Sequence, residues 1–285
     1  MILDGHCHVW ERWPYEPAPP DVASRSRAEQ LLFEMDAAGV ERAAIICAAI
    51  GENPRNVDYA FECATRRPGR FVVFPDVDCR WSRDYHAPGA ARRLAKALER
   101  WRFEGFTHYL SEQESGDWLV SEEGREFFAL AATHRLIVSL SALPHQMPNV
   151  IALAGLIPTT PIICHHFAFL GPRSAATPDS MGLVLGAAAA PNVFIKYSGA
   201  GNVAAPDHEF PYRELQSDFD RLADAFGAPR MIWGSDYPVS RRHMTYKQTL
   251  SHLVRHGPFR GPSLEAVLSG NLTMLLEGGR DFSQG

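Results

Sequence analysis

The feature that most constrains this fold is an alternation of short apolar runs with longer segments of helical periodicity. The runs are rich in β-branched and aromatic residues, and several are apolar almost throughout, as expected for parallel strands that are covered on both faces. They span residues 2–8, 43–49, 70–77, 104–109, 136–140, 162–166, 192–198 and 231–235. Helix-like segments lie at 28–38, 57–66, 90–101, 122–133, 148–156, 179–189, 215–226 and 246–255, and a last one covers 264–276.

Eight strand–helix units in 285 residues predict an α/β protein with a (β/α)8 TIM-barrel fold. We expect a single domain over residues 1–285, with segment 264–276 as an extra C-terminal helix. A doubly wound open sheet is the alternative, but such sheets usually carry a glycine-rich first turn. Here the first strand runs into His6-Cys7-His8, and the chain contains neither a GxGxxG nor a P-loop motif.

Charge and composition limit the classes of partner. The net charge is −5 and the basic residues are dispersed in short pairs, so we expect no nucleic acid partner. No apolar run approaches the roughly 20 residues that span a bilayer, and no secretory signal is visible, so no membrane partner is expected. Five scattered cysteines without a CxxC pair suit reduced thiols in a cytoplasmic protein. A small-molecule substrate is the expected partner, and homo-oligomer formation stays open.

Polar residues at the ends of the predicted strands are the candidate site, because barrel active sites lie at the C-terminal ends of the strands. His6 and His8 end the first strand and share one of its faces, so both imidazoles can reach the same metal ion. Asp236 follows the eighth strand, where it can bind a metal, accept a proton from water, or simply cap the next loop.

The sixth strand ends with two adjacent histidines, His165 and His166. Strand alternation places only one of them inside the barrel, and we expect it to be His166, which is nearer the strand end and shares a face with Cys164. At least one of the pair is then expected to be structural. Since strands 1 and 8 are neighbours in a closed barrel, His6, His8, His166 and Asp236 are predicted to converge on one point.

This constellation resembles the amidohydrolase superfamily, and more narrowly the amidohydrolase-related branch that includes sugar lactonases, pyrone-dicarboxylate lactonase and aminocarboxymuconate-semialdehyde decarboxylase. The likeness covers nearly the whole chain in order. It is carried by DGHCHVW (4–10), GFTH (105–108), His166, NVFIKYSG (192–199), WGSDYP (233–238) and VLSGNLTMLL (267–276).

The resemblance implies roles for the four central residues. Asp236 would activate water as the catalytic base, with His166 as the second catalytic residue. His6, His8 and His166, with Asp236, would hold one divalent metal such as zinc or manganese. In some lactonases of the branch the histidines hold the substrate carbonyl directly, so a metal-free site stays open as well.

Two departures from the family pattern narrow these implications. The fifth strand carries Ser139 and Ser141 where metal-binding members usually have a histidine, and the fourth offers no bridging lysine or glutamate. A binuclear centre is therefore not expected. Thr107, with His108 beside it, stands where related lactonases often carry a substrate-binding arginine.

Further residues are candidates for substrate binding, on their position near strand ends: Trp10, His108, Tyr109, Ser139, Ser141 and Tyr237. We interpret Lys196, at the end of the seventh strand, as a structural lysine. The proline-rich segment 12–24 is either a wall over the site or a surface excursion.

The reaction that best fits these residues is hydrolysis of a lactone or another small cyclic ester by water activated at Asp236. The alternative is a metal-dependent, non-oxidative decarboxylase of an aromatic or enoic acid, which the missing histidine on the fifth strand disfavours. A barrel whose site has become a non-catalytic binding module is the third alternative, and retention of all four central residues argues against it.

Overall fold

The structure is a computed structural model that describes residues 1–172, 179–278 and 282. Its eight strands are all parallel to their neighbours, and each lies within or beside a predicted run. They are β1 (Leu3–Cys7), β2 (Arg42–Ile46), β3 (Phe71–Phe74), β4 (Gly105–Tyr109), β5 (Ile137–Ser141), β6 (Ile162–Cys164), β7 (Val193–Tyr197) and β8 (Met231–Trp233).

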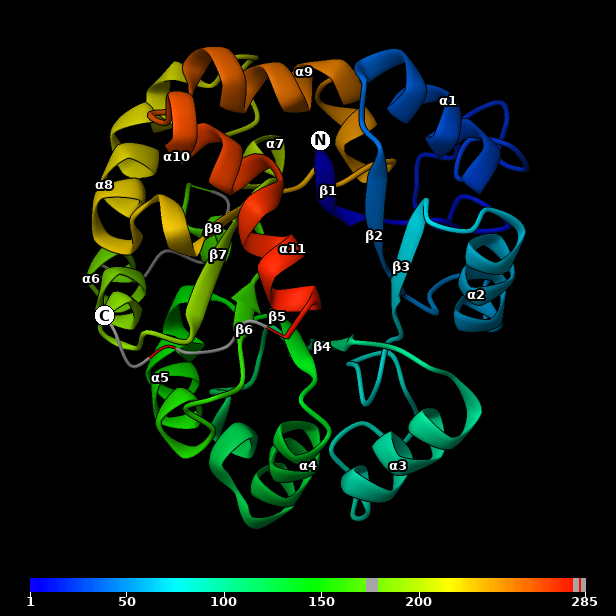
Figure 1. The fold of residues 1–285 in the computed structure, drawn as a ribbon, viewed down its shortest axis with the longest axis vertical. Coiled ribbons are helices and arrows are strands. Elements are labelled where there is room, and N and C mark those ends of the chain that lie inside the picture. Colours follow the sequence, from blue (N-terminus) through cyan, green and yellow to red (C-terminus); the bar gives the residue numbers. More distant parts are fainter. Residues whose placement is uncertain (173–178, 279–281, 283–285) are drawn as a thin grey trace.

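The strands close into a ring. Strands β1 to β3 form one sheet and β4 to β8 another, and two isolated bridges join their edges. One bridge pairs Asp76, just after β3, with Thr107 of β4, and the other pairs Cys7 of β1 with Tyr237, just after β8. The predicted (β/α)8 barrel is thus confirmed, with the strands surrounded by helices (Figure 1).

The helices follow the predicted segments closely. They are α1 (Ala28–Ala38), α2 (Asn56–Arg66), α3 (Ala90–Arg100), α4 (Glu122–Thr133), α5 (Met147–Leu156), α6 (Ser180–Gly186), α7 (Ala200–Val203), α8 (Gln216–Phe226), α9 (Tyr246–Ser251), α10 (Gly261–Glu265) and α11 (Asn271–Leu276). The four-residue helix α7 was not predicted, and 264–276 is divided into α10, a wider turn and α11. No helix in the described ranges is both long and apolar enough to cross a membrane.

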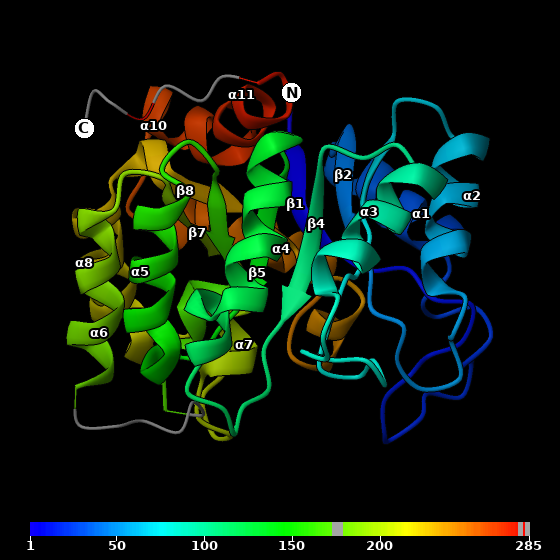
Figure 2. The same ribbon diagram turned by 90° about the horizontal axis from the view of Figure 1, so that it is seen from below.

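The barrel interior is apolar at its N-terminal end. Inward side chains from seven strands pack there with Leu272 and Leu275 of α11: Leu3, Ala44, Ile46, Val72, Phe74, Ile137, Ile163, Phe194 and Ile232. The extra C-terminal helix is therefore a plug for this end. Figure 2 shows α11 and the N-terminus at the end of the barrel opposite the arrowheads. The candidate site lies at the opposite, C-terminal end of the barrel.

Candidate active site

The site is centred on the carboxylate of Asp236, which is buried at the C-terminal end of β8. Three imidazole nitrogens surround its Oδ1 atom: Nε2 of His8 at 3.5 Å, of His6 at 3.6 Å and of His166 at 3.7 Å. Its other oxygen, Oδ2, accepts a hydrogen bond of 2.7 Å from the side chain of Asn202 on α7. The structure thus brings together the four residues that the sequence placed at one point.

Strand β1 delivers two imidazoles because its register is irregular. Leu3 lies in the interior apolar cluster, and His6, an odd number of residues later, also faces inward. The pairing of β1 with β2 shifts between Asp4 and Cys7, and such a bulge re-aims the side chains that follow it. His8 is then fixed by a hydrogen bond of 2.6 Å from its Nδ1 to the carbonyl of Ile46.

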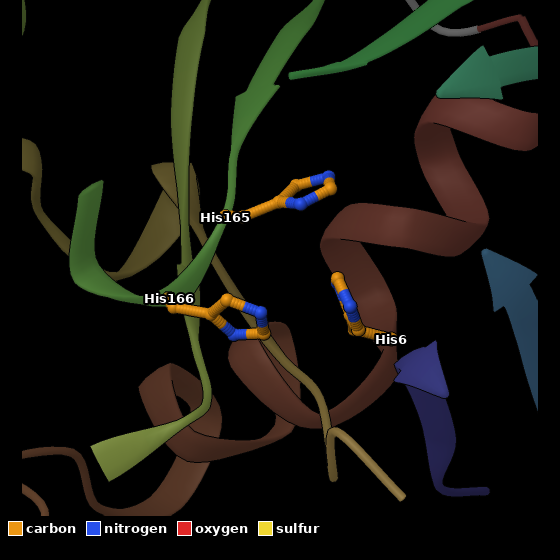
Figure 3. A group of neighbouring side chains, drawn as sticks. All are labelled: His6, His165 and His166. Atoms are coloured by element: carbon orange, nitrogen blue, oxygen red, sulfur yellow. The ribbon is translucent and has the colours of Figure 1, made fainter. Parts of the chain in front are cut away.

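Both histidines at the end of β6 point into the site, which corrects the expectation that one would be structural and away from it. By strand alternation the inward residue is His165, and Cys164 faces the helix layer. His166 reaches the site because the strand has ended and residues 166–169 adopt positive φ angles. The rings of His165 and His166 lie 4.6 and 4.5 Å, centroid to centroid, from the ring of His6 (Figure 3).

Asp4 ties β1 to β8 beneath the site. Its buried carboxylate accepts hydrogen bonds from the backbone and hydroxyl of Ser235 and from the hydroxyl of Tyr246. Burial raises the pKa of Asp4 to about 6, although these donors act in the opposite direction. The backbone N–H of Asp236 in turn donates to the carbonyl of His6 at 2.7 Å, so the two strand ends are held together.

Lys196 and Ser139 form a polar layer directly below the imidazoles. The Lys196 amine lies 2.9 Å from Nδ1 of His6 and 2.8 Å from the Ser139 hydroxyl, which is 2.7 Å from Nε2 of His165. Lys196 is therefore a structural lysine that supports the imidazoles of the site directly. Ser139 is fully buried in this layer and lies outside the cavity lining, which corrects its expected role in touching substrate.

Burial and neighbouring charges favour the neutral form of the His6 and His166 imidazoles and the ionised form of the central carboxylate. Burial lowers the pKa of His166 to about 4, and burial with the nearby Lys196 holds the pKa of His6 well below 6.5. Burial alone would raise the pKa of Asp236, but His166, His8 and Asn202 outweigh it and hold the pKa below the ordinary 3.8. The arrangement favours a carboxylate base beside the uncharged imidazoles of His6 and His166 at neutral pH.

A cavity of about 550 Å³ opens above these groups. His8, His166 and Asp236 form its floor, and Tyr109 and Ser141, both predicted to bind substrate, line it. Other lining residues come from the segments that follow the strands at the C-terminal end of the barrel, among them Tyr15, Arg80, Asn202 and Arg242.

Three other predicted substrate-binding residues lie outside this cavity. His108 faces the helix layer, packed on Trp118 and bonded to the carbonyl of Val77, because Thr107 and Tyr109 take the inward face of β4. Trp10 is buried, stacks on His8 and donates to the carbonyl of Ala48. The hydroxyl of Tyr237 is directed to the carbonyl of Arg25. These three are corrected to supporting residues.

Tyr15 shows what the proline-rich segment does. Its ring lies edge-on to Trp10 at 5.8 Å, and Arg242 lies over it at 5.4 Å, so the segment is held against the mouth of the barrel. It is therefore a wall of the cavity rather than a surface excursion. Asn202, Tyr15 and Arg242 lie in the segments that follow strands. Of these three, only Tyr15 had a signal in the sequence, the aromatic content of the proline-rich segment.

Comparison with known proteins identifies the family. Residues 3–256 match the amidohydrolase family. The chain belongs to this family.

Individual relatives agree with this assignment. The chain is 28% identical over 249 residues to an L-fucono-1,5-lactonase from Burkholderia ambifaria, covering 84% of this chain and 81% of the relative. An amidohydrolase from Burkholderia multivorans, crystallised with zinc, superposes with a TM-score of 0.79 at 20% identity, covering 97% and 99% of the two chains. A probable 2-pyrone-4,6-dicarboxylic acid hydrolase from Acinetobacter baumannii gives 0.72 at 16% identity, with the same coverage.

The donor set of this amidohydrolase fits one divalent ion. Zinc binds histidine nitrogen at about 2.0–2.1 Å, so two ligands of a tetrahedral ion lie about 3.3 Å apart. The Nε2 atoms of His6 and His8 lie 3.2 Å apart, and Oδ1 of Asp236 lies 3.6 and 3.5 Å from them. These three residues would hold the ion, with His166 beside the same carboxylate oxygen.

Proposed function

We propose that this amidohydrolase opens a lactone or a similar small cyclic ester by adding water. The observation that carries the proposal is the buried carboxylate of Asp236, which lies among three imidazoles on the floor of an open cavity and whose pKa is held below the ordinary 3.8. A carboxylate at this place can accept a proton only from a group that enters from the cavity, and water is the simplest such group.

The reaction would proceed in two steps. Asp236 takes a proton from water, and the resulting hydroxide forms a bond to the carbonyl carbon of the lactone. The tetrahedral oxyanion collapses, the ring C–O bond breaks, and the alkoxide takes up the proton from Asp236, which returns to its ionised form. An ester suits this site because an alkoxide needs less assistance in leaving than an amine does.

A divalent ion held by His6, His8 and Asp236 would polarise the carbonyl and stabilise the oxyanion. Without it, hydrogen-bond donors at the cavity surface would have to do so. Tyr109 lines the cavity, its ring edge-on to that of His165 at 5.0 Å, and would be one such donor.

The cavity supports a small, hydroxylated substrate. Its volume of about 550 Å³ is in the range of small-molecule sites, and its lining joins tyrosines and a serine with the guanidinium of Arg242. A sugar lactone offers hydroxyl groups to such a lining. The named activity of the Burkholderia ambifaria relative supports this substrate class.

The proposal is tested with a panel of 1,4- and 1,5-lactones of sugar acids, followed by proton release with a pH indicator. Linear esters and amides of the same acids serve as controls for ring opening. We expect hydrolysis of at least one lactone well above the spontaneous rate and little hydrolysis of the linear amides. Turnover of the amides with no lactone opened would contradict the proposal.

A further inference from the structure

His6 has an unusual partner for a residue that could bind a metal. Metal-binding histidines almost always donate their second ring N–H to a carboxylate, a carbonyl or water. His8 follows this rule, since its Nδ1 donates to the carbonyl of Ile46. Nδ1 of His6 instead faces the amine of Lys196 at 2.9 Å, deep in the barrel, where both side chains are buried.

The hydrogen positions in this group follow from the one partner that can only accept. A carbonyl has no hydrogen, so the neutral ring of His8 carries its proton on Nδ1 and has its lone pair on Nε2. The Nε2 atom of His8 lies 3.2 Å from Nε2 of His6. In the metal-free arrangement His6 must therefore carry its proton on Nε2, because two lone pairs at this distance repel each other.

Nδ1 of His6 is then an acceptor, and Lys196 is its donor. A lysine side chain has N–H groups for this bond and for the Ser139 hydroxyl at 2.8 Å, whether or not it is protonated. The direction of the chain is thus Lys196 to His6 to His8 to Ile46. Each donor in it has an acceptor, and each lone pair on the facing nitrogens is used.

We propose that Lys196 holds His6 in the Nε2–H form and thereby competes with a divalent ion for His6. A neutral imidazole has a single lone pair, which can accept from Lys196 at Nδ1 or bind a metal at Nε2, but cannot do both. For an ion to bind at Nε2, the ring proton of His6 must move to Nδ1, and the hydrogen bond that Lys196 donates to Nδ1 must be lost. Lys196 is in this sense a positioning residue that lowers the affinity of the site for metal.

Zinc binding to Lys196→Met tests this proposal. Tag-free, chelator-treated protein is titrated with zinc by equilibrium dialysis, and the variant is expected to bind about tenfold more tightly or better, the scale on which partners of metal-binding histidines act. A variant with a damaged site would bind zinc more weakly, so tighter binding would not be explained by a loss of structure. Binding equal to or weaker than that of the unchanged protein would overturn the proposal.

Two further variants assign the gain to His6. Ser198→Ala removes the hydroxyl that lies 3.0 Å from Nδ1 of His166. A hydroxyl can donate or accept, so Ser198 does not fix the tautomer of this ring, and its loss should not tighten zinc binding. Adding His6→Ala to Lys196→Met should abolish the gain. A gain that survives loss of His6, or that Ser198→Ala reproduces, would overturn the proposal.

Nitrogen-15 NMR of the histidine rings shows which ring nitrogen carries the proton. It uses the unchanged, metal-free protein, so it does not depend on whether a variant folds. The expected result is a proton on Nε2 of His6 and on Nδ1 of His8. A proton on Nδ1 of His6 would overturn the proposal.

Discussion

Asn202 should control the basicity of Asp236. It lies on the four-residue helix α7, and its amide donates a hydrogen bond of 2.7 Å to Oδ2 of Asp236, the oxygen that does not face the imidazoles. Replacing it by alanine leaves one oxygen of a buried carboxylate without this donor.

The expected loss follows from the charge on the acceptor. A hydrogen bond to a charged group contributes about 1.5–3 kcal/mol, and each 1.4 kcal/mol is a factor of ten. If the bond orients the carboxylate in the transition state, Asn202→Ala should lower kcat/KM on the best lactone by about 10- to 100-fold. Because this bond lowers the pKa of Asp236, its loss should also move the acid limb of the pH profile to higher pH.

The assay is the pH dependence of lactone opening by Asn202→Ala, and Asn149→Ala is the matched control. Asn149 makes the same bond, from its amide to a carboxylate oxygen of Asp117 at 2.8 Å, on an exposed part of the chain. We expect the control to behave like the unchanged protein. An Asn202→Ala variant with the same rate and the same acid limb would refute the reasoning.

Three other outcomes are expected. Gly234→Ala would place a Cβ atom 2.7 Å from Cβ of His6 and should lower the free energy of unfolding by about 1–3 kcal/mol. Gly155→Ala is the control, because its Cβ would have no neighbour within 4 Å, and equal urea denaturation curves for the two variants would contradict the prediction. The free energy of unfolding should fall as the pH drops below 6.5, because folding lowers the pKa of His166 and His252 to about 4, so the unfolded chain binds more protons at these residues. Asp4, whose pKa folding raises to about 6, opposes this only in part. Greater stability at pH 5 than at pH 7 would count against the prediction. No carbon dioxide should be released from a panel of hydroxybenzoates, and its release would favour the decarboxylase.

The sequence was sufficient for the barrel and the centre of the site because both depend on strand ends. Short apolar runs alternating with helices admit few topologies, and a polar residue that ends a parallel strand lies at the barrel mouth wherever the strand begins. His6, His8 and Asp236 were found in this way. The register shift between Asp4 and Cys7 re-aims the end of β1, but it leaves His6 and His8 on one face, as predicted.

The side chains that were misplaced depend on details that the local sequence does not carry. His165 was excluded because strand alternation allows only one inward histidine, and nothing in the sequence indicated that His166 would enter the site as well. His166 does so through positive φ angles at residues 166–169, where no glycine indicates them. His108 and Ser139 required the register of β4 and β5 against their neighbours. Lys196 was interpreted as structural, but its place beneath the imidazoles could be seen only in the packed interior, where Phe194 and Lys196 share the inward face.

The most direct test of the account is the rate of lactone opening by Asp236→Asn, measured on the best substrate of the lactone panel with protein shown to be folded. Asparagine keeps the shape and the partner Asn202 but cannot accept the proton from water. We expect kcat to fall by about 100- to 10,000-fold, the usual contribution of a general base, with a smaller change in KM. A variant that retained kcat within a few-fold of the unchanged protein would contradict the assignment of Asp236 as the base.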